Sequence, residues 1–183
     1  MAVDFDIKIA DAVAGDELEF KKIYFQVWPE IYAGCVSDIG KEDIISELEL
    51  IWADLLGKWH IIIENNGTRD GYYCVAKDGD SIIGMCGAIR EKTNNRIRDF
   101  YILADYRAQG VGRKLFDRAV DWFGNDLPIL MDVVAYNKKV ISILENHGFL
   151  RTNEPLRYRK IAGNKKVPII EFCFKKSPKL FNI

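Results

Sequence analysis

The stretch Arg107-Ala108-Gln109-Gly110-Val111-Gly112 constrains this chain most, because it joins two segments of different periodicity. Residues 97–103 before it are rich in β-branched and aromatic side chains and predict a strand, while an amphipathic helix is predicted from Val111 onward. Glycine at a strand-to-helix turn lets a ligand approach the backbone, and the unpaired N–H groups of a first helical turn favour an anion. We therefore expect this turn to bind a phosphate or pyrophosphate.

Strand and helix signals on both sides of this turn predict a mixed α/β sheet of the α+β type. Residues 97–135 read as strand, helix and strand, which is a parallel crossover. Residues 72–89 and 157–174 each predict a β-hairpin, the first around Asp78-Gly79. The sheet is therefore expected to be mostly antiparallel with one parallel pairing. A dinucleotide-binding Rossmann fold is disfavoured, because its fingerprint needs a third glycine where this chain has Leu115.

The N-terminal third of the chain predicts one strand and two helices. Residues 5–9 alternate apolar and polar side chains, as a half-buried strand does. A first helix ends soon after Pro29, and a second covers roughly 42–59. Residues 60–64 fit either the end of that helix or a short strand. No repeat, low-complexity segment or linker interrupts the chain, so residues 1–183 are expected to form one domain.

Composition and charge argue against several classes of protein. The formal net charge of −1 disfavours a nucleic-acid-binding protein. No apolar run is long enough to cross a bilayer and the N-terminus lacks the features of a secretory signal, so we expect no membrane association. The cysteines form no CxxC pair, which indicates free thiols in a reducing cytoplasm, and with only two histidines we expect no metal site. The cysteines are Cys35, Cys74, Cys86 and Cys173.

Two motifs resemble those of the GNAT superfamily of N-acetyltransferases. The first is Asp99-Phe-Tyr-Ile-Leu-Ala-Asp-Tyr-Arg107-Ala-Gln-Gly110-Val-Gly112, and the second runs from Asn137 through Gly148-Phe149. In that family the first motif is the strand and R/Q-x-x-G-x-G/A loop that receives acetyl-CoA, and the second is the helix beside the cofactor. The resemblance is strongest over residues 82–149. It implies a GNAT-like fold and an acyltransferase that uses acetyl-CoA as cosubstrate.

The resemblance also implies which residues contact acetyl-CoA. Backbone groups of Ile102, Leu103 and Ala104 would run alongside the pantetheine, and an N–H near Leu103 would stabilise the charge that develops on the thioester oxygen. Asn137 would contact the cofactor near its thiol end, although asparagine serves equally well as a helix N-cap. The pyrophosphate would lie in the turn, whose residues are Arg107, Ala108, Gln109, Gly110, Val111, Gly112 and Arg113.

Acetyl transfer to an amine calls for a general base. An alkylammonium with a pKa of about 10.4 is only about one part in two thousand neutral at pH 7, a penalty of roughly 4.6 kcal/mol. Asp132 is the first candidate, because ribosomal-protein alanine acetyltransferases of the superfamily carry a base glutamate in the matching strand. Asp132 would act through a bridging water, and the alternative is a structural or substrate-orienting carboxylate. Asp99 is the second candidate and a candidate for binding the acceptor, whereas Arg96 stands where some histone-type members have a glutamate.

The position seven residues after Asn137 departs from the family pattern. Relatives usually carry a tyrosine there as general acid toward the leaving thiolate, whereas this chain has Leu144. Tyr136, Tyr101 or a water molecule are the substitutes, and Tyr136 is our candidate. A thiolate with a pKa of about 8.5 is a tolerable leaving group, so a missing acid should slow turnover rather than abolish it.

The acceptor site would be formed by the first two helices, the central strands and the last hairpin. Trp28, Tyr32 and Tyr158 are candidates to line it, although helical aromatic residues more often belong to a core. No basic cluster stands out in the sequence, so a polyanionic acceptor is not favoured, and a small-molecule amine or a peptide N-terminus remains open. A homodimer is also left open. The alternative to an enzyme is a catalytically idle acyl-CoA-binding module, which Leu144 would explain.

Overall fold

An eight-stranded sheet organises the residues that the computed structural model describes, which are 6–35, 39–124 and 126–175. The strand order is β1-β2-β3-β4-β5-β8-β6, and β7 pairs with β8 outside this path. The strands are β1 (Ile7–Asp11), β2 (Gly71–Asp78), β3 (Ser81–Arg90), β4 (Asn95–Ile102), β5 (Ile129–Val134), β6 (Leu150–Arg151), β7 (Arg157–Ala162) and β8 (Lys165–Phe174). Every pairing is antiparallel except that of β4 with β5, which confirms the predicted mixed sheet with one parallel crossover.

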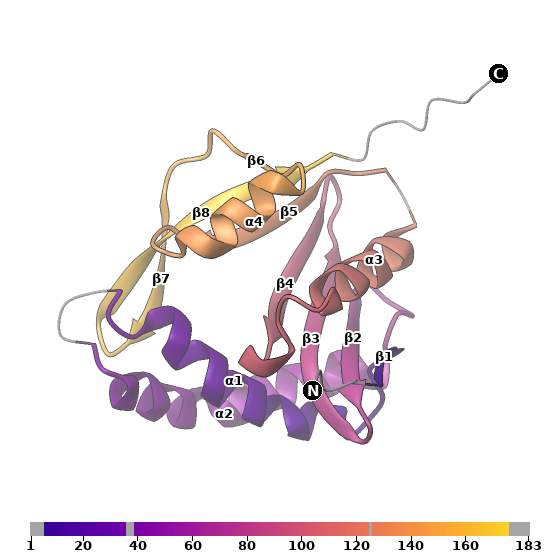
Figure 1. The fold of residues 1–183 in the computed structure, drawn as a ribbon, viewed down its shortest axis with the longest axis horizontal. Helices are drawn as coiled ribbons and strands as arrows, with labels where there is room; N and C mark the ends of the chain where they lie inside the picture. Colours follow the sequence, from indigo (N-terminus) through magenta and orange to yellow (C-terminus); the bar gives the residue numbers. More distant parts are fainter. Residues whose placement is uncertain (1–5, 36–38, 125, 176–183) are drawn as a thin grey trace.

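Helices cover both faces of this sheet (Figure 1). They are α1 (Asp16–Tyr32), α2 (Lys41–Glu64), α3 (Val111–Phe123) and α4 (Lys138–Asn146), with a short 3₁₀ turn η1 (Ala104–Tyr106). Adjacent residues of β2 identify the faces, because successive side chains of a strand point in opposite directions. Tyr73 packs against Phe20 of α1, with ring centroids 5.9 Å apart, whereas the Sγ of Cys74 lies 3.6 Å from the carbonyl oxygen of Leu115 in α3. Thus α1 lies on one face and α3 on the other.

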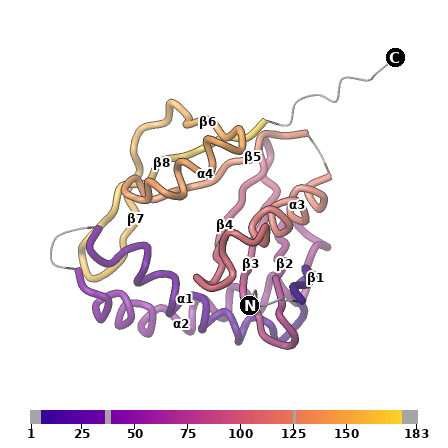
Figure 2. The backbone as a smooth tube through the Cα atoms, viewed as in Figure 1, coloured from indigo at the N-terminus to yellow at the C-terminus, as the bar shows by residue number. Residues whose placement is uncertain are grey.

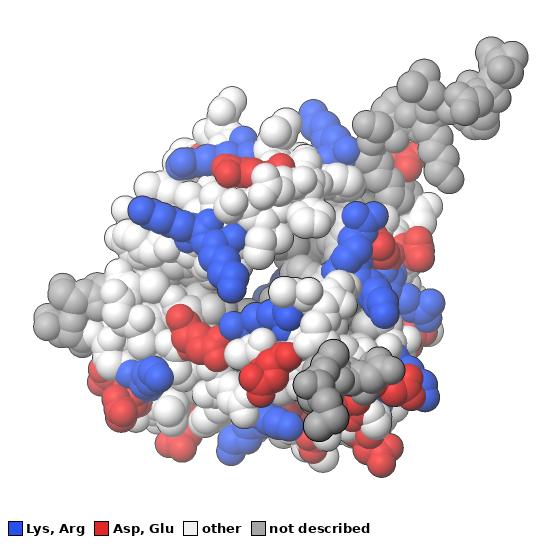
Figure 3. Space-filling model, in the orientation of Figure 1, with Lys and Arg blue, Asp and Glu red and all other residues white. Residues whose placement is uncertain are grey.

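The parallel pair β4 and β5 separates after a few residues. Their register covers only Asn95–Ile97 against Ile129–Met131, and beyond it the two strands diverge (Figures 1 and 2). One part of the molecule therefore contains β1 to β4 with α1 to α3, and the other contains β5, β8 and β6 with α4. Figure 3 shows the surface hollowed between these parts, with Lys and Arg side chains around the hollow. This opening places the ends of β4 and β5 where a ligand can reach both.

Several predicted boundaries change in the structure. Residues 60–64 belong to α2, because Trp59 and Ile63 are both buried one helical turn apart and keep the helical spacing. The last strand begins at Lys165 rather than at position 169, so the β7–β8 turn is tighter than expected. The two-residue strand β6 was not predicted, since so short an edge segment carries no periodic signal. The first residue of the predicted strand, Phe5, lies outside the described residues.

None of the helices in the described part of the chain has the length and apolar character needed to span a bilayer. No group of three or more His, Cys, Asp or Glu side chains within it is arranged to hold a metal ion.

Candidate functional site

The N-terminus of α3 presents a run of free backbone N–H groups. Gly110, its N-cap residue, has a φ of +77°, and Ala108 has a φ of +62°, both in the left-handed region. No side chain caps this helix end, and its first turn contains no acidic residue. Among the described residues, no protein atom accepts a hydrogen bond from the backbone N–H groups of residues 108–113. Successive free N–H groups at a helix N-terminus favour an anion, and they lie in the turn where the sequence analysis expects a phosphate.

Gly112 brings this helix end close to the end of β4. A Cβ atom at this position would lie 3.2 Å from Cδ1 of Ile102, which is tighter than an ordinary contact. The N–H of Leu103 donates to the carbonyl oxygen of Ile83 at 2.9 Å, so it belongs to the β3–β4 ladder and is engaged. Because backbone groups alternate along a strand, the N–H of Ile102 points away from β3, toward the side from which β5 has diverged. Ile102, and not Leu103, therefore offers the outward N–H.

Side chains of the turn support its conformation. Arg107 donates from Nε to the carbonyl oxygen of Ile102 at 2.8 Å, and its Nη2 lies 2.7 Å from Oε2 of Glu30 in α1. Gln109 donates from Nε2 to the carbonyl oxygen of Asp105 at 2.8 Å. These contacts hold the turn through its side chains and leave its main chain exposed.

Asp132, in β5, belongs to a cluster of two carboxylates and two guanidinium groups. Its Oδ1 accepts hydrogen bonds from Arg96, at 3.3 Å, and from Arg157. Glu171 lies opposite on β8 and accepts from the same two arginines at 3.2 and 3.0 Å. Burial alone would lower the pKa of Arg96, but Asp132 and Glu171 raise it above its ordinary value. The Oδ2 of Asp132 accepts no hydrogen bond from any described residue, so one oxygen remains available.

Asp99 occupies a bulge in β4 and holds two buried tyrosines. The register of β3 and β4 shifts between Met85 and Gly87, and Asp99 has a φ of +50°. Its Oδ1 accepts from the hydroxyl of Tyr24 at 2.7 Å and its Oδ2 from that of Tyr73 at 2.5 Å. Burial, and then the charge of Asp99, raise the pKa of both tyrosine hydroxyls well above the ordinary value. Both carboxylate oxygens are thus engaged beneath the sheet, which leaves Asp132 as the better placed carboxylate.

The start of α4 is capped, unlike that of α3. The Oδ1 of Asn137 accepts a hydrogen bond from the N–H of Val140 at 3.2 Å, so the N-cap role is present and the amide Nδ2 stays free for another partner. Tyr136, just before it, is 55% exposed. Leu144 is 6% exposed and belongs to the apolar core. Its side chain therefore contributes packing where relatives carry an acid.

The predicted aromatic residues divide between core and surface. Trp28 is 8% exposed and its ring centroid lies 5.0 Å from that of Tyr32, while the Tyr32 hydroxyl accepts from Nη1 of Arg159 at 3.0 Å. Tyr158 is 64% exposed, on the opposite side of β7 from Arg159. Tyr158 therefore points away from the α1 side, and Arg159 takes its place there.

The structure brings together basic residues that the sequence analysis did not connect. They come from two Arg-x-Arg pairs, one on β4 and one on β7, and their members are Arg96, Arg98, Arg157 and Arg159. Because alternate residues of a strand share a face, each pair sends two guanidinium groups to one side of the sheet. The period-two spacing was a readable signal, but only the tertiary structure brings β4 and β7 to the same opening.

Comparison with known proteins gives one family match. The sequence model of the Acetyltransferase (GNAT) family matches residues 40–149, which is more than half of the chain. The matched segment contains the α3 turn, Asp132 and Asn137. No curated protein matches the sequence.

Solved structures share the fold. PaiA N-acetyltransferase from Thermoplasma acidophilum, in complex with coenzyme A, superposes with a TM-score of 0.69 at 16% identity over 91% of this chain and 98% of its own. The ribosomal-protein-S18-alanine N-acetyltransferase from Escherichia coli gives 0.61 at 15% identity, over 97% and 98%. The yncA protein from Salmonella typhimurium, with its cofactor acetyl-CoA, gives 0.57 at 14% identity, over 92% and 93%. At these identities the similarity concerns the fold.

Proposed function

Because this chain belongs to the acetyltransferase (GNAT) family, we propose that it is an N-acetyltransferase that moves an acetyl group from acetyl-CoA to a primary amine. The acceptor is a small molecule or a peptide N-terminus, and its nitrogen attacks the thioester directly. One observation carries the proposal: the backbone N–H groups of residues 108–113 have no acceptor among the described residues and lie where the family receives its cofactor.

The described residues fit coenzyme A. The free N–H run at α3 suits the two negative phosphates, and Gly112 keeps that helix end against Ile102 at the end of β4. The pantetheine would follow Ile102, Leu103 and Ala104, and the free Nδ2 of Asn137 would meet its thiol end. The coenzyme A and acetyl-CoA in the PaiA and yncA structures support this assignment. Acetyl-CoA, when bound, supplies an activated acyl group to the site.

Asp132 is proposed as the general base. Its Oδ2 is free, while Arg96 and Arg157 hold its Oδ1 and fix the side chain. The Oδ2 atom accepts a proton from the acceptor amine through one water molecule, which the shorter aspartate side chain requires.

The N–H of Ile102 is proposed to stabilise negative charge on the reacting carbonyl oxygen. It points away from β3 at the place where β5 has left the sheet, so no strand competes for it there. One such donor is worth about 2.7–4 kcal/mol in comparable enzymes. Tyr136, which is 55% exposed, is proposed to donate a proton to the leaving thiolate in place of the tyrosine that Leu144 replaces.

The proposal is tested by measuring coenzyme A binding and acetyl transfer separately. Coenzyme A at about one hundred times its dissociation constant should stabilise the protein by about 2.7 kcal/mol, and pantetheine, which lacks the diphosphate, should stabilise it far less. Incubation with acetyl-CoA and a pooled amine library should yield acetylated products by mass spectrometry. Equal binding of both ligands would contradict the assigned turn. Binding of coenzyme A without any product would favour an idle acyl-CoA-binding module, which the buried Leu144 would then explain.

Asp132→Asn tests the base. It keeps the shape of the side chain and should lower kcat by at least about 100-fold, with little change in coenzyme A affinity. Asp126→Asn is the matched control, because Asp126 is exposed and lies before the same strand. An unchanged kcat in Asp132→Asn would exclude Asp132 as the base.

A further inference from the structure

Arg159 differs from the other arginines of the opening in having no carboxylate partner. The other three arginines, Arg96, Arg98 and Arg157, each lie within 4 Å of at least one carboxylate. In the part of the chain that the structure describes, no carboxylate lies that close to Arg159, and its one hydrogen bond is the donation to Tyr32. A half-buried guanidinium with five N–H donors usually pairs with an anion. Arg159 therefore has unused donors and no direct ion pair, although the charge of Asp132 acts on it from a longer distance and helps to raise its pKa.

A second unused donor lies beside it. The indole Nε1–H of Trp28 is buried and finds no acceptor at hydrogen-bond distance among the described residues. Trp28 packs on Tyr32, which Arg159 contacts, so one tyrosine adjoins both donors. Trp28 and Arg159 also lie near the hydroxyl of Tyr101: burial raises the pKa of this hydroxyl well above its ordinary value, and Arg159 and Trp28 oppose that rise. Two donors from different elements thus converge on Tyr32 and Tyr101, which offer them only neutral hydroxyl groups. Such a cluster of donors suits an oxyanion.

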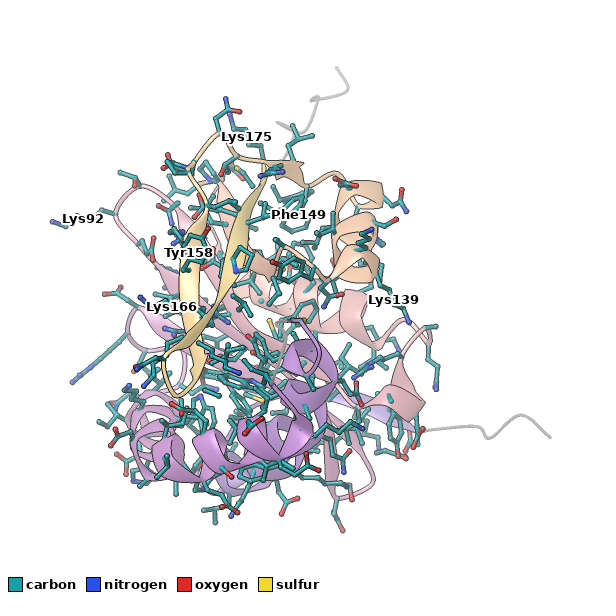
Figure 4. The ribbon with its side chains drawn as sticks, turned by 90° about the vertical axis from the view of Figure 1, so that its left-hand side faces the viewer. Lys92, Lys139, Phe149, Tyr158, Lys166 and Lys175 are labelled. Atoms are coloured by element: carbon teal, nitrogen blue, oxygen red, sulfur yellow. The ribbon has the colours of Figure 1, made fainter. Side chains whose placement is uncertain are left out.

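This cluster of donors lies beside the proposed reacting end of β4. Tyr101 precedes Ile102, whose N–H is proposed to face the thioester, and its ring packs on Tyr24 of α1, on the face opposite α3. The β7–β8 hairpin closes this side over α1 and α2, where Glu47 of α2 accepts from the N–H of Gly163 at 3.1 Å. Figure 4 shows the hairpin standing over these two helices, with Lys166 toward its turn. An oxyanion bound there would be a short distance from the attacking amine.

We propose that Arg159, with the Nε1–H of Trp28, binds the carboxylate of the acceptor, and that the acceptor is a free amino acid or a similar small amino carboxylate. The amine and carboxylate of such a molecule are separated by few bonds, which matches the position of Arg159 beside the end of β4. This inference rests on the proposed acetyltransferase function and narrows its acceptor class. A polyamine has no anion to place against Arg159, and a peptide N-terminus carries no carboxylate next to its amine.

The test compares amino acids with their carboxamides, which keep the amine and lose the negative charge. Wild-type protein should acetylate the best amino acid with a kcat/KM about 10- to 100-fold above that of its amide, as expected for hydrogen bonds to a charged group. Arg159→Met should remove this preference, and Trp28→Phe, which keeps an aromatic ring, should reduce it several-fold. Lys166→Met is the matched control, because it removes an exposed positive charge from the same hairpin.

A second measurement needs no turnover. N-acetyl amino acids should bind the protein more tightly than their amides by calorimetry, and Arg159→Met should abolish the difference. Folding of each variant is checked by circular dichroism and by an unchanged affinity for coenzyme A. If coenzyme A binds and carboxamides, polyamines or peptide N-termini are acetylated as well as amino acids, this inference is wrong and the acetyltransferase function stands. If coenzyme A does not bind at all, the proposed function fails first.

Discussion

Helices α2 and α3 both begin after a glycine, but the first turns of the two helices differ in charge. At α2, the N–H of Gly40 donates to Oδ2 of Asp43 at 2.8 Å, and the first turn contains two acidic residues that complement the helix dipole. At α3, which follows Gly110, the first turn has no acidic residue. Neither helix has a side-chain cap, so the two helix ends differ in the carboxylates that stand at the start of α2 and are missing at the start of α3.

The first turn of α1 also carries acidic residues, and Oε2 of Glu17 accepts from the N–H of Gly15, although no side chain caps this helix. The start of α4 is capped by Asn137. Only α3, among these four helices, has neither an acidic first turn nor a cap. Acidic residues near a helix N-terminus contribute about 0.3–1 kcal/mol each, so α3 forgoes this stabilisation, and the proposed binding of the diphosphate would account for it.

A carboxylate introduced at the N-terminus of α3 should have the largest effect, on the affinity for coenzyme A. Gly110→Asp places a carboxylate at the free N–H groups, in a left-handed position that aspartate tolerates. Coenzyme A affinity should fall by about 100-fold or more, since like charges about 4 Å apart near a protein surface repel by about 4 kcal/mol. The measurement is calorimetric titration. Gly124→Asp is the control, because Gly124 has a φ of +60° at the other end of the same helix. Equal losses in both variants would show that α3 is not the diphosphate site.

Removing the N-cap of α4 should have a smaller effect, partly on stability and partly on cofactor binding. Asn137→Ala removes the cap to Val140 and should lower the free energy of unfolding by about 1 kcal/mol, measured by urea denaturation. Asn137→Asp keeps the cap and should stay within about 0.5 kcal/mol of wild type. Both variants lose the amide Nδ2, so both should raise the dissociation constant for acetyl-CoA several-fold. An unchanged dissociation constant would restrict Asn137 to its capping role.

Removing the carboxylate at the start of α2 should affect stability alone. Asp43→Ala removes the hydrogen bond to Gly40 and an acidic charge near the helix N-terminus, at a cost of about 0.5–1 kcal/mol. Coenzyme A affinity should not change, because α2 lies on the face of the sheet opposite α3. Asp54→Ala, an exposed position later in α2, is the control for loss of one negative charge. A weaker affinity for coenzyme A in Asp43→Ala would contradict the distinction between the acidic start of α2 and the start of α3, which has no acidic residue.

The smallest effect concerns the contact between Glu17, in the first turn of α1, and His60, and it depends on pH. Nδ1 of His60 lies 3.0 Å from Oε1 of Glu17. The hydrogen bond that His60 donates to Glu17, and then the charge of Glu64, raise the pKa of His60 above its ordinary 6.5. Burial acts to raise the pKa of Glu17, but hydrogen bonds from His60 and Gly15 leave it below the ordinary 4.5. The stability due to His60 is therefore complete below pH 6.5 and lost as pH rises through its raised pKa. The part due to Glu17 is complete above pH 4.5 and lost below it.

The melting temperature of wild type should accordingly exceed that of His60→Gln most between pH 4.5 and 6.5. The difference should shrink toward pH 8. Thermal melts of the two proteins across this range give the measurement. A difference that grows with rising pH would show that the His60–Glu17 contact does not stabilise the fold as described.

Much of the fold could be predicted because its signals are local. The Asp-Gly turn, the strand before Arg107 and the helical stripe after Val111 are each determined by neighbouring residues, and the structure confirms the crossover that they predict. Residues 60–64 could not be assigned, since three successive isoleucines fit a strand as well as a helix. Burial of Trp59 and Ile63 on one helical face decides for the helix.

The candidate site also has parts that could be predicted and parts that could not. The glycine turn could be predicted from the sequence, because its backbone conformation depends on a few adjacent residues. The partners of Asp132 and Asp99 were not readable, since Arg157, Glu171, Tyr24 and Tyr73 are distant in sequence and meet through strand register and helix packing.

The sequence by itself determined the order of the longer strands and helices, the family motifs and the expectation of an anion at the N-terminus of α3. Only the tertiary structure decided which donors and acceptors remain free. The N–H of Leu103 donates a hydrogen bond to β3, whereas the N–H of Ile102 points away from β3. Arg96 and Arg157 both pair with Asp132, whereas Arg159 has no carboxylate at that distance among the described residues. The physical reason is that hydrogen bonds and ion pairs are satisfied by proximity in space, which the linear order of residues does not record.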